Sequence, residues 1–267
     1  MSLAERIDPE PVLLEERGAH GILRLTMNRP AARNALSMEL MAALIAALDR
    51  AGSDKETRVV IIAGVGVGFC PGHDLREMRS DPSREAYKRI FDRCSEMMQK
   101  IVRLKQPVIA EVHGIATAAG CQMVASCDLA VAAEDARFAT SGINVGLFCS
   151  TPMVALSRAI GRKAAMEMLL TGDFIDAATA QTLGLVNRVV PAAQLRRATD
   201  ALAHKIAEKS AMAIALGKEA FYRQIEMDLS AAYAYTSEVM TRNMLAHDAE
   251  EGIDAFIAKR KPVWTDD

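Results

Sequence analysis

Two segments of the sequence carry small residues where a chain can bring backbone N–H groups against a ligand. They span residues 69–78, which include Gly72-His73-Asp74, and residues 113–122, which include Ala118-Ala119-Gly120. Each follows a predicted buried strand and leads into a helix, whose first N–H groups are free and whose dipole favours negative charge. Two such donors meeting at one oxygen would form an oxyanion hole, which suits a thioester carbonyl that becomes an enolate. Close packing of a helix on a strand accounts for the small residues equally well.

The glycine-rich loop of residues 64–72 does not match a nucleotide site. A dinucleotide-binding fingerprint that starts at Gly64 needs glycine at position 69, where Phe69 stands. The phosphate-binding patterns GxxxxGKS and GxxxxGKT are absent from the sequence. We interpret the loop as a flexible connection between a strand and a helix.

The elements that must position these segments alternate between strands and helices. Short apolar runs rich in β-branched residues predict strands, and amphipathic spacing predicts helices. Helices are expected at residues 37–50, 87–104 and 120–126, with a mainly helical pattern from residue 151. Strands are expected at residues 12–14, 22–27, 59–63, 108–112, 129–132, 137–140 and 185–190. This order predicts an α/β core over residues 1–195 and a C-terminal helical subdomain over residues 196–267.

The composition narrows the class of protein. The 267 residues are 51% hydrophobic and carry a net charge of −2, so we expect a sizeable core and neither nucleic acid nor a membrane as partner. No segment reaches the ~18 apolar residues of a membrane span. Residues 1–16 are charged and lack the apolar stretch of a secretion signal, which predicts a cytoplasmic protein. Because the five cysteines are widely spaced and form no CxxC pair, we predict free thiols and no metal site.

Landmarks over most of the chain resemble those of the enoyl-CoA hydratase/isomerase (crotonase) family. They occur in the family's order and include the two small-residue segments. The landmarks are Asn28-Arg29-Pro30, Asn34-Ala35-Leu36, Gly72-His73-Asp74-Leu75, Pro107-Val108-Ile109-Ala110, His113-Gly114, Ala119-Gly120-Cys121, Cys127-Asp128-Leu129-Ala130, Thr171-Gly172, Gly184-Leu185-Val186 and Lys259-Arg260-Lys261-Pro262.

The resemblance implies a crotonase-like spiral of ββα turns whose C-terminal helices form a homotrimer or a dimer of trimers. It also implies an acyl-CoA thioester as ligand, with coenzyme A as part of the substrate and no separate cofactor. The thioester oxygen would be bound by the backbone N–H groups of His73 and Ala119. The residues expected to contact the coenzyme are Ala31, Arg33, His73, Asp74, Leu75, Arg76 and Lys259. Lys259 would do so from the same or from a neighbouring subunit.

Two positions depart from the pattern of the family's hydratases. By the resemblance, those enzymes carry one glutamate three residues after the second oxyanion donor, where this chain has Gln122. They carry another in a segment like Phe-Gly-Gln-Pro-Glu, where this chain has Gly142. Hydration needs a base to activate water and an acid to protonate the α carbon, and a neutral amide supplies neither. We therefore predict that ordinary hydratase activity is weak or absent.

Other side chains are candidates for the missing acid–base role. The segment that replaces the second glutamate loop offers Cys149 as a thiol and four polar residues, which are Ser141, Asn144, Ser150 and Thr151. The four polar residues are equally typical of an ordinary loop. Cys149 is equally typical of a buried thiol without a chemical role. Glu111 lies mid-strand and is either a buried functional charge or a salt-bridged group. The side chain of His73 either takes part in the chemistry or points to solvent. We interpret Asp128 as a structural residue.

Three functions remain open. The small-residue segments favour an enzyme that acts on an acyl-CoA thioester, a lyase or isomerase of fatty acyl-CoA metabolism with non-standard acid–base residues. The two absent glutamates favour a non-catalytic acyl-CoA-binding protein. A peptidase is the third reading, because some serine proteases use a related spiral core, but the sequence has no GxSxG motif to support it.

Overall fold

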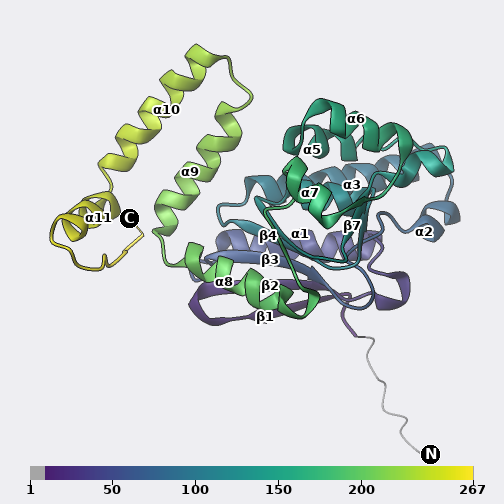
Figure 1. Cartoon of the computed structure of the whole chain (residues 1–267), viewed down its shortest axis with the longest axis horizontal. Coiled ribbons are helices and arrows are strands. Elements are labelled where there is room, and N and C mark those ends of the chain that lie inside the picture. Colours follow the sequence, from purple (N-terminus) through teal and green to yellow (C-terminus); the bar gives the residue numbers. More distant parts are fainter. Residues whose placement is uncertain (1–9, 267) are drawn as a thin grey trace, which may run out of the picture.

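A six-stranded sheet forms the centre of the molecule (Figure 1). The computed structural model describes residues 10–266. The prediction that residues 1–16 carry no secretion signal therefore falls mostly outside the described residues. The first two strands pair antiparallel and all the others pair parallel. In spatial order the strands are β1 (Leu13–Arg17), β2 (Ile22–Met27), β3 (Val59–Gly64), β4 (Val108–Val112), β6 (Leu129–Ala133) and β9 (Arg188–Val190). The predicted α/β class is confirmed, although β9 is shorter than the expected strand at residues 185–190.

Both faces of this sheet are covered, as expected for parallel strands with continuous apolar sequences. Alternate residues of β3 face opposite sides: Val60 and Ile62 join the main core, whereas Val59 and Ile61 join a smaller one. The helices over the main core are α1 (Met38–Ser53), α3 (Arg84–Arg103) and α4 (Ala119–Ser126). The smaller core lies under α8 (Leu195–Ala207).

A second, three-stranded sheet lies beside the first. It consists of β5 (Ile115–Thr117), β7 (Arg137–Ala139) and β8 (Ile175–Asp176), in the order β5-β7-β8. Strands β4 and β5 followed by α4 make one ββα turn of the chain, and the sequence had not revealed the short strands β5 and β8. The remaining helices of the core are α2 (Leu75–Ser80), α5 (Pro152–Ala159), α6 (Arg162–Thr171) and α7 (Ala177–Leu183).

Helix α8 is fixed to the sheet by a buried ion pair as well as by apolar contacts. Arg24 on β2 donates to Glu111 on β4 at 2.7 Å and to Asp200 on α8 at 2.6 Å. Only 5% of the Arg24 side chain is exposed, so this charge depends on its two carboxylate partners. Glu111 is therefore a salt-bridged residue, paired with the same arginine that binds α8.

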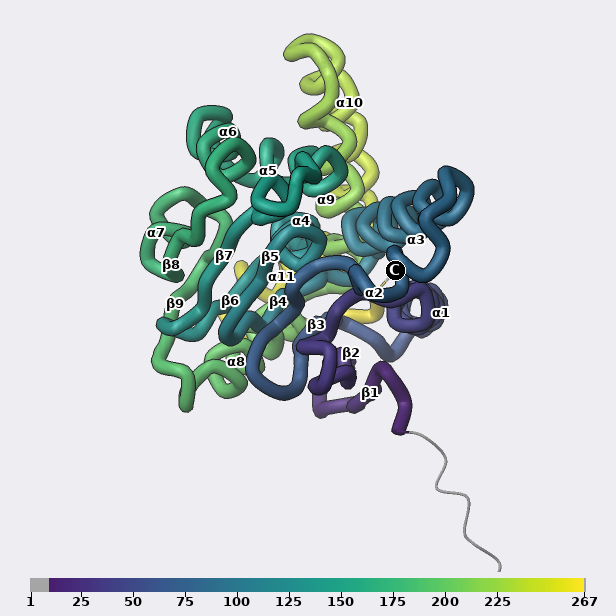
Figure 2. The backbone as a smooth tube through the Cα atoms, turned by 90° about the vertical axis from the view of Figure 1, so that its right-hand side faces the viewer, coloured from purple at the N-terminus to yellow at the C-terminus, as the bar shows by residue number. Residues whose placement is uncertain are grey.

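The last three helices extend away from the core. They are α9 (Ala211–Gln224), α10 (Leu229–Met244) and α11 (His247–Ile257), and Figure 2 shows α10 projecting beyond the sheets. Helix α8 packs on the sheet, and α9 is tied to the core through Lys218. The division of the chain at residue 195 stays a prediction. Among residues 10–266, no helix combines the length and apolar character that a membrane crossing requires.

Candidate active site

The two small-residue segments run side by side in the structure. A parallel bridge joins Cys70 to Ala116, and the N–H of Thr117 donates to the carbonyl of Cys70 at 2.9 Å. Gly120 is required at this contact, because a Cβ atom there would lie 2.1 Å from the Cys70 carbonyl oxygen. The small residues thus serve close packing, and this packing brings the starts of α2 and α4 together.

Two unusual backbone conformations turn the segments toward each other. Gly72 has a φ of +107°, and a Cβ atom at this position would lie 3.4 Å from the Ala119 nitrogen. Ala118 has a φ of 48°, a left-handed value that is uncommon for a residue with a side chain. Strained residues of this kind cluster at ligand sites, where the surrounding structure holds them in place. They set the directions of the next residues, His73 and Ala119.

The N–H groups of His73 and Ala119 both lack a hydrogen-bond partner in this part of the structure. Within residues 10–266, neither N–H donates to an acceptor. Ala119 is the first residue of α4, where an N–H has no partner inside the helix and the helix dipole is positive. Two free donors from adjoining turns can bind one oxygen and stabilise negative charge on it.

The imidazole of His73 is turned into the protein and not out to solvent. Both ring nitrogens are buried, and neither has a hydrogen-bond partner among residues 10–266. The ring lies edge-on to Phe91 of α3, with 5.6 Å between ring centroids. Burial lowers the pKa of His73 to about 4, so the imidazole is neutral near pH 7.

Gln122 lies one helical turn beyond Ala119 and is 5% exposed. Its side-chain oxygen lies 4.0 Å from the Cys94 sulfur on α3, at the limit of a weak S–H hydrogen bond. Since Cys94 is one turn along α3 from Phe91, the Gln122 amide and the His73 ring approach the same part of that helix. The amide has no proton to exchange near neutral pH, so it can orient a ligand or a water but cannot act as an acid or base.

Gly142 lies in a short 3₁₀-helix, η3 (Ser141–Val145), at the position where the family resemblance predicts a glutamate. A Cβ atom on Gly142 would lie 2.4 Å from the Leu147 carbonyl oxygen and 2.8 Å from the Cys149 sulfur. The φ of Gly142 is not left-handed, so the need for glycine comes from this close approach.

The other loop candidates have little sign of activation. Ser150 is exposed, and its hydroxyl donates to the nearby Phe148 carbonyl at 3.4 Å. Cys149 is buried, and burial raises the pKa of its thiol, which disfavours the thiolate that a nucleophile requires. All five cysteines are free and buried. Among residues 10–266, no cluster of three potential metal ligands is present.

The segments expected to contact coenzyme A are neighbours. A parallel bridge joins Leu36 to His73, and the N–H of Asp74 donates to the Leu36 carbonyl at 3.0 Å. Arg29 reinforces this contact by donating to the Asp74 carboxylate at 2.9 Å, which helps to lower the pKa of Asp74 against the opposing effect of its burial. Asp74 also caps α2, so the carboxylate is structural in this state. The other residues of these segments that we predict to contact coenzyme A lie at the surface. They are Ala31, Arg33, Leu75 and Arg76.

Lys259 does not join these residues within one chain. It follows α11, which lies at the opposite end of the molecule from α2 (Figure 1). Its side chain is exposed. A ligand bound beside Arg33 and Arg76 would therefore meet Lys259 only from a second copy of the chain.

Sequence reasoning missed three contributors to the site: Arg29, Phe91 and Cys94. Arg29 was visible as part of a landmark, but its pairing with Asp74 spans 45 residues. Phe91 and Cys94 lie on one side of an amphipathic helix, and apolar spacing alone does not reveal which of its residues face a site.

The sequence and the fold are similar to those of known proteins. The enoyl-CoA hydratase/isomerase family profile matches residues 17–267. The chain belongs to this family. A crystal structure of an enoyl-CoA hydratase from Mycobacterium smegmatis is 56% identical in sequence and superposes with a TM-score of 0.94, covering 96% of this chain and 99% of that one. The crotonase fold predicted from the resemblance is therefore confirmed.

Members of a named group within the family are also similar. Enoyl-CoA hydratase domain-containing protein 3, mitochondrial, of Xenopus laevis is 48% identical over 96% of this chain and 86% of its own length. The crystal structure of the human protein of that name is 45% identical, with a TM-score of 0.92 over 95% of this chain and 100% of that one. The family assignment thus rests on nearly the whole length of both chains.

Proposed function

We propose that this member of the enoyl-CoA hydratase/isomerase family binds an acyl-CoA thioester with its carbonyl oxygen between the N–H groups of His73 and Ala119. The supporting observation is the pair of unpaired N–H donors at the starts of α2 and α4. When a proton leaves the α carbon, the electron pair moves onto the thioester oxygen, and the two donors stabilise that charge. On this basis the chain is a lyase or isomerase of fatty acyl-CoA metabolism with non-standard acid–base residues.

The alternative is an acyl-CoA-binding protein that has lost hydratase chemistry. Gln122 and Gly142 favour this reading, because neither can replace a glutamate as acid or base. It shares the binding site with the first proposal and differs only in turnover. A non-hydratase reaction in the same pocket would favour the enzyme.

Trimer formation, or a dimer of trimers, is part of the proposal. The segment from α9 to α11 exposes large apolar side chains, including Leu229 at 75%, Leu245 at 83% and Phe256 at 84%. Exposed apolar surface of this extent is typical of an interface between proteins. A second copy would also supply the Lys259 that one chain cannot bring to the α2 region. A cytoplasmic location stays a prediction, while the similar vertebrate proteins are named as mitochondrial.

Calorimetry with butyryl-CoA tests the shared binding site. We expect a dissociation constant in the micromolar range or tighter, together with a rise in melting temperature, because a ligand that binds only the native state stabilises it. The absence of both heat and a thermal shift would overturn the proposal.

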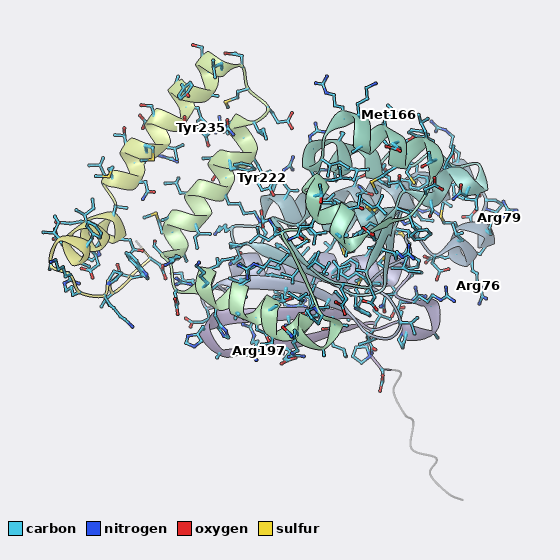
Figure 3. The ribbon with its side chains drawn as sticks, in the orientation of Figure 1. Arg76, Arg79, Met166, Arg197, Tyr222 and Tyr235 are labelled. Carbon is cyan, nitrogen blue, oxygen red and sulfur yellow. The ribbon has the colours of Figure 1, made fainter. Side chains whose placement is uncertain are left out.

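Two arginines of α2 provide a matched pair of variants. Arg76 lies at the start of the helix and Arg79 in its last turn, both exposed, and Figure 3 shows their side chains at the surface. Arg76→Ala should weaken butyryl-CoA binding several-fold by removing a phosphate contact, whereas Arg79→Ala, with the same change of charge, should have a smaller effect. Equal effects of the two variants would speak against the proposed path of the coenzyme.

A further inference from the structure

The hydroxyl of Thr117 joins the two segments that carry the unpaired donors. Thr117 is the last residue of β5 and is 5% exposed, and its hydroxyl donates to the Pro71 carbonyl at 2.8 Å. Its backbone N–H donates to the Cys70 carbonyl, so one residue holds two consecutive peptide groups of the other segment. The backbone bond belongs to the pairing of the segments, whereas the side-chain bond fixes a peptide beyond that pairing.

The peptide held by this hydroxyl comes directly before a glycine. Gly72 has a φ of +107°, and glycine adopts positive and negative φ about equally readily, so residue 72 does not by itself fix the direction of the chain. After it, the Gly72 carbonyl accepts from the Leu36 N–H at 2.8 Å. Because this peptide is trans and planar, the His73 N–H points away from Leu36. The direction of this donor therefore depends on two anchors, Thr117 before the glycine and Leu36 after it.

The second donor lies equally close to the same hydrogen bond along the chain. Ala119 comes two residues after Thr117, and the other donor comes two residues after Pro71. The Ala118 carbonyl accepts from the Gln122 N–H at 3.0 Å in the first turn of α4, so the next N–H points out of the helix start. The hydroxyl of Thr117 thus ties the two segments together two residues before each donor.

We propose that Thr117 is a positioning residue, whose hydroxyl sets the separation at which the N–H groups of His73 and Ala119 reach one thioester oxygen. This inference rests on the proposed function. One oxygen receives both hydrogen bonds only if each donor nitrogen lies within about 3 Å of it. Loss of the hydroxyl would free the peptide before Gly72 to turn, and the bond from His73 would become longer or less well aligned.

The test compares butyryl-CoA with the thioether S-butyl-CoA, in which two hydrogens replace the carbonyl oxygen. The ratio of the two affinities reports on the contacts of that oxygen, because the coenzyme and the length of the alkyl chain are the same. In calorimetry we expect the parent to prefer the thioester at least about ten-fold. Thr117→Val keeps the shape of the side chain without its hydroxyl and should lower the preference to about two-fold or less. Thr117→Ser keeps the hydroxyl and should keep the parent's preference.

Thr199 of α8 provides a matched control. It is 0% exposed, and its hydroxyl donates to the Leu195 carbonyl at 3.0 Å. Thr199→Val removes the same kind of buried bond, so it should lower the free energy of unfolding and leave the preference for the thioester unchanged. If Thr117→Val likewise lost stability but kept the preference, its hydroxyl would be purely structural and this inference would be overturned.

Infrared spectroscopy of bound butyryl-CoA, labelled with ¹³C at the carbonyl, gives a second readout. Hydrogen bonds to a carbonyl oxygen lower its stretching frequency, so the frequency should fall on binding to the parent and fall less on binding to Thr117→Val. Should Thr117→Val not fold, Thr117→Cys, whose thiol is a weaker donor, should show a reduced shift and a reduced preference. Parent values in that variant would overturn the inference. A parent that binds the thioester and the thioether equally, or binds neither, would instead overturn the proposed function.

Discussion

The ammonium group of Lys218 lies 2.6 Å from the Asp128 carboxylate, and this pair joins α9 to the core of the molecule. The same carboxylate accepts hydrogen bonds from the Tyr222 hydroxyl at 2.9 Å and from the Val108 N–H at 2.7 Å. Lys218 also donates to the carbonyls of Ile101 and Gln106. Asp128 is thus structural, as interpreted from the sequence, and it fixes the position of the helices expected to form the trimer.

Removal of the Lys218 charge should loosen this junction. Only 8% of the Lys218 side chain is exposed, and burial lowers its pKa against the opposing effect of Asp128. We expect Lys218→Met to lower the free energy of unfolding by about 3 kcal/mol, because it leaves a largely buried carboxylate without its cation. Urea denaturation followed by circular dichroism measures the change.

An exposed ion pair provides the control for that variant. Arg158 of α5 donates to Glu226, just after α9, at 2.9 Å, and both side chains are 58% exposed. Arg158→Met should cost less than about 1 kcal/mol, because water screens the pair and solvates the remaining charge. Losses of equal size in the two variants would mean that burial of Asp128 does not determine the cost.

The pKa of His73 predicts how stability depends on pH. The folded pKa is about 4, below the ordinary value of 6.5, so between these values the unfolded chain binds more protons than the folded one. The stability contributed by the neutral ring is therefore complete above about pH 6.5 and falls as the pH decreases. Each pH unit in this window corresponds to about 1.4 kcal/mol, which predicts a loss of roughly 2 kcal/mol by about pH 5.

Comparison with His73→Phe isolates this effect from the titration of carboxylates. Urea denaturation of both proteins near pH 7 and near pH 5 should show a smaller loss of stability in the variant, by roughly 2 kcal/mol. Between about pH 7 and pH 8 the two proteins should respond alike. A parallel loss in both proteins at low pH would show that the folded protein protonates His73 readily.

Local features of the fold could be predicted from the sequence. The helix expected at residues 37–50 is α1, and Ser37 caps its start by accepting from the Leu40 N–H at 3.2 Å. The buried strands β3 and β4 were also predicted, because their apolar runs identify them without reference to a partner. Strands β5 and β8 were missed because two or three residues carry no period, and only pairing with β7 defines them.

The candidate site, too, was predictable from the sequence only in part. The closeness of residues 69–78 and 113–122 was foreseeable, since both follow neighbouring parallel strands and need small residues. The inward direction of the His73 ring was not, because it depends on how α3 packs over α2. The steric need for glycine at position 142 likewise depends on Leu147 and Cys149, which approach through the return of a loop.

Gly142 should tolerate even a methyl group poorly. The Cβ atom of Gly142→Ala would lie 2.4 Å from the Leu147 carbonyl oxygen, so the loop must move. We expect a loss of about 1–3 kcal/mol in the free energy of unfolding, as for other overpacked sites. Gly161→Ala, where nothing lies within 4 Å of the added atom, should change stability by less than about 1 kcal/mol. If Gly142→Ala left the free energy of unfolding unchanged, residues 141–149 would have to adjust freely to the added methyl group.

Introduction of carboxylates at positions 122 and 142 tests whether acid–base groups there limit hydratase chemistry. The parent protein should turn over crotonyl-CoA far more slowly than the ~10 s⁻¹ typical of enzymes, since Gln122 and Gly142 supply no acid or base. We expect the double variant Gln122→Glu/Gly142→Glu to gain measurable activity, because the oxyanion donors lie outside both substitutions. Either single substitution should gain little, since the acid and base act together. The strain at Gly142 should make the double variant less stable than its parent.

The matched control separates acid–base chemistry from the shape of the pocket. Gly142→Gln places a side chain of nearly the same size beside Cys149 and leaves the amide of Gln122, so this variant carries the same strain but no carboxylate. It should remain inactive toward crotonyl-CoA. Activity is followed by the loss of the enoyl-thioester absorbance, with butyryl-CoA binding as the check that each variant is folded. A double carboxylate variant that binds butyryl-CoA and hydrates no faster than Gly142→Gln would show that the pocket is built for another reaction or for binding alone.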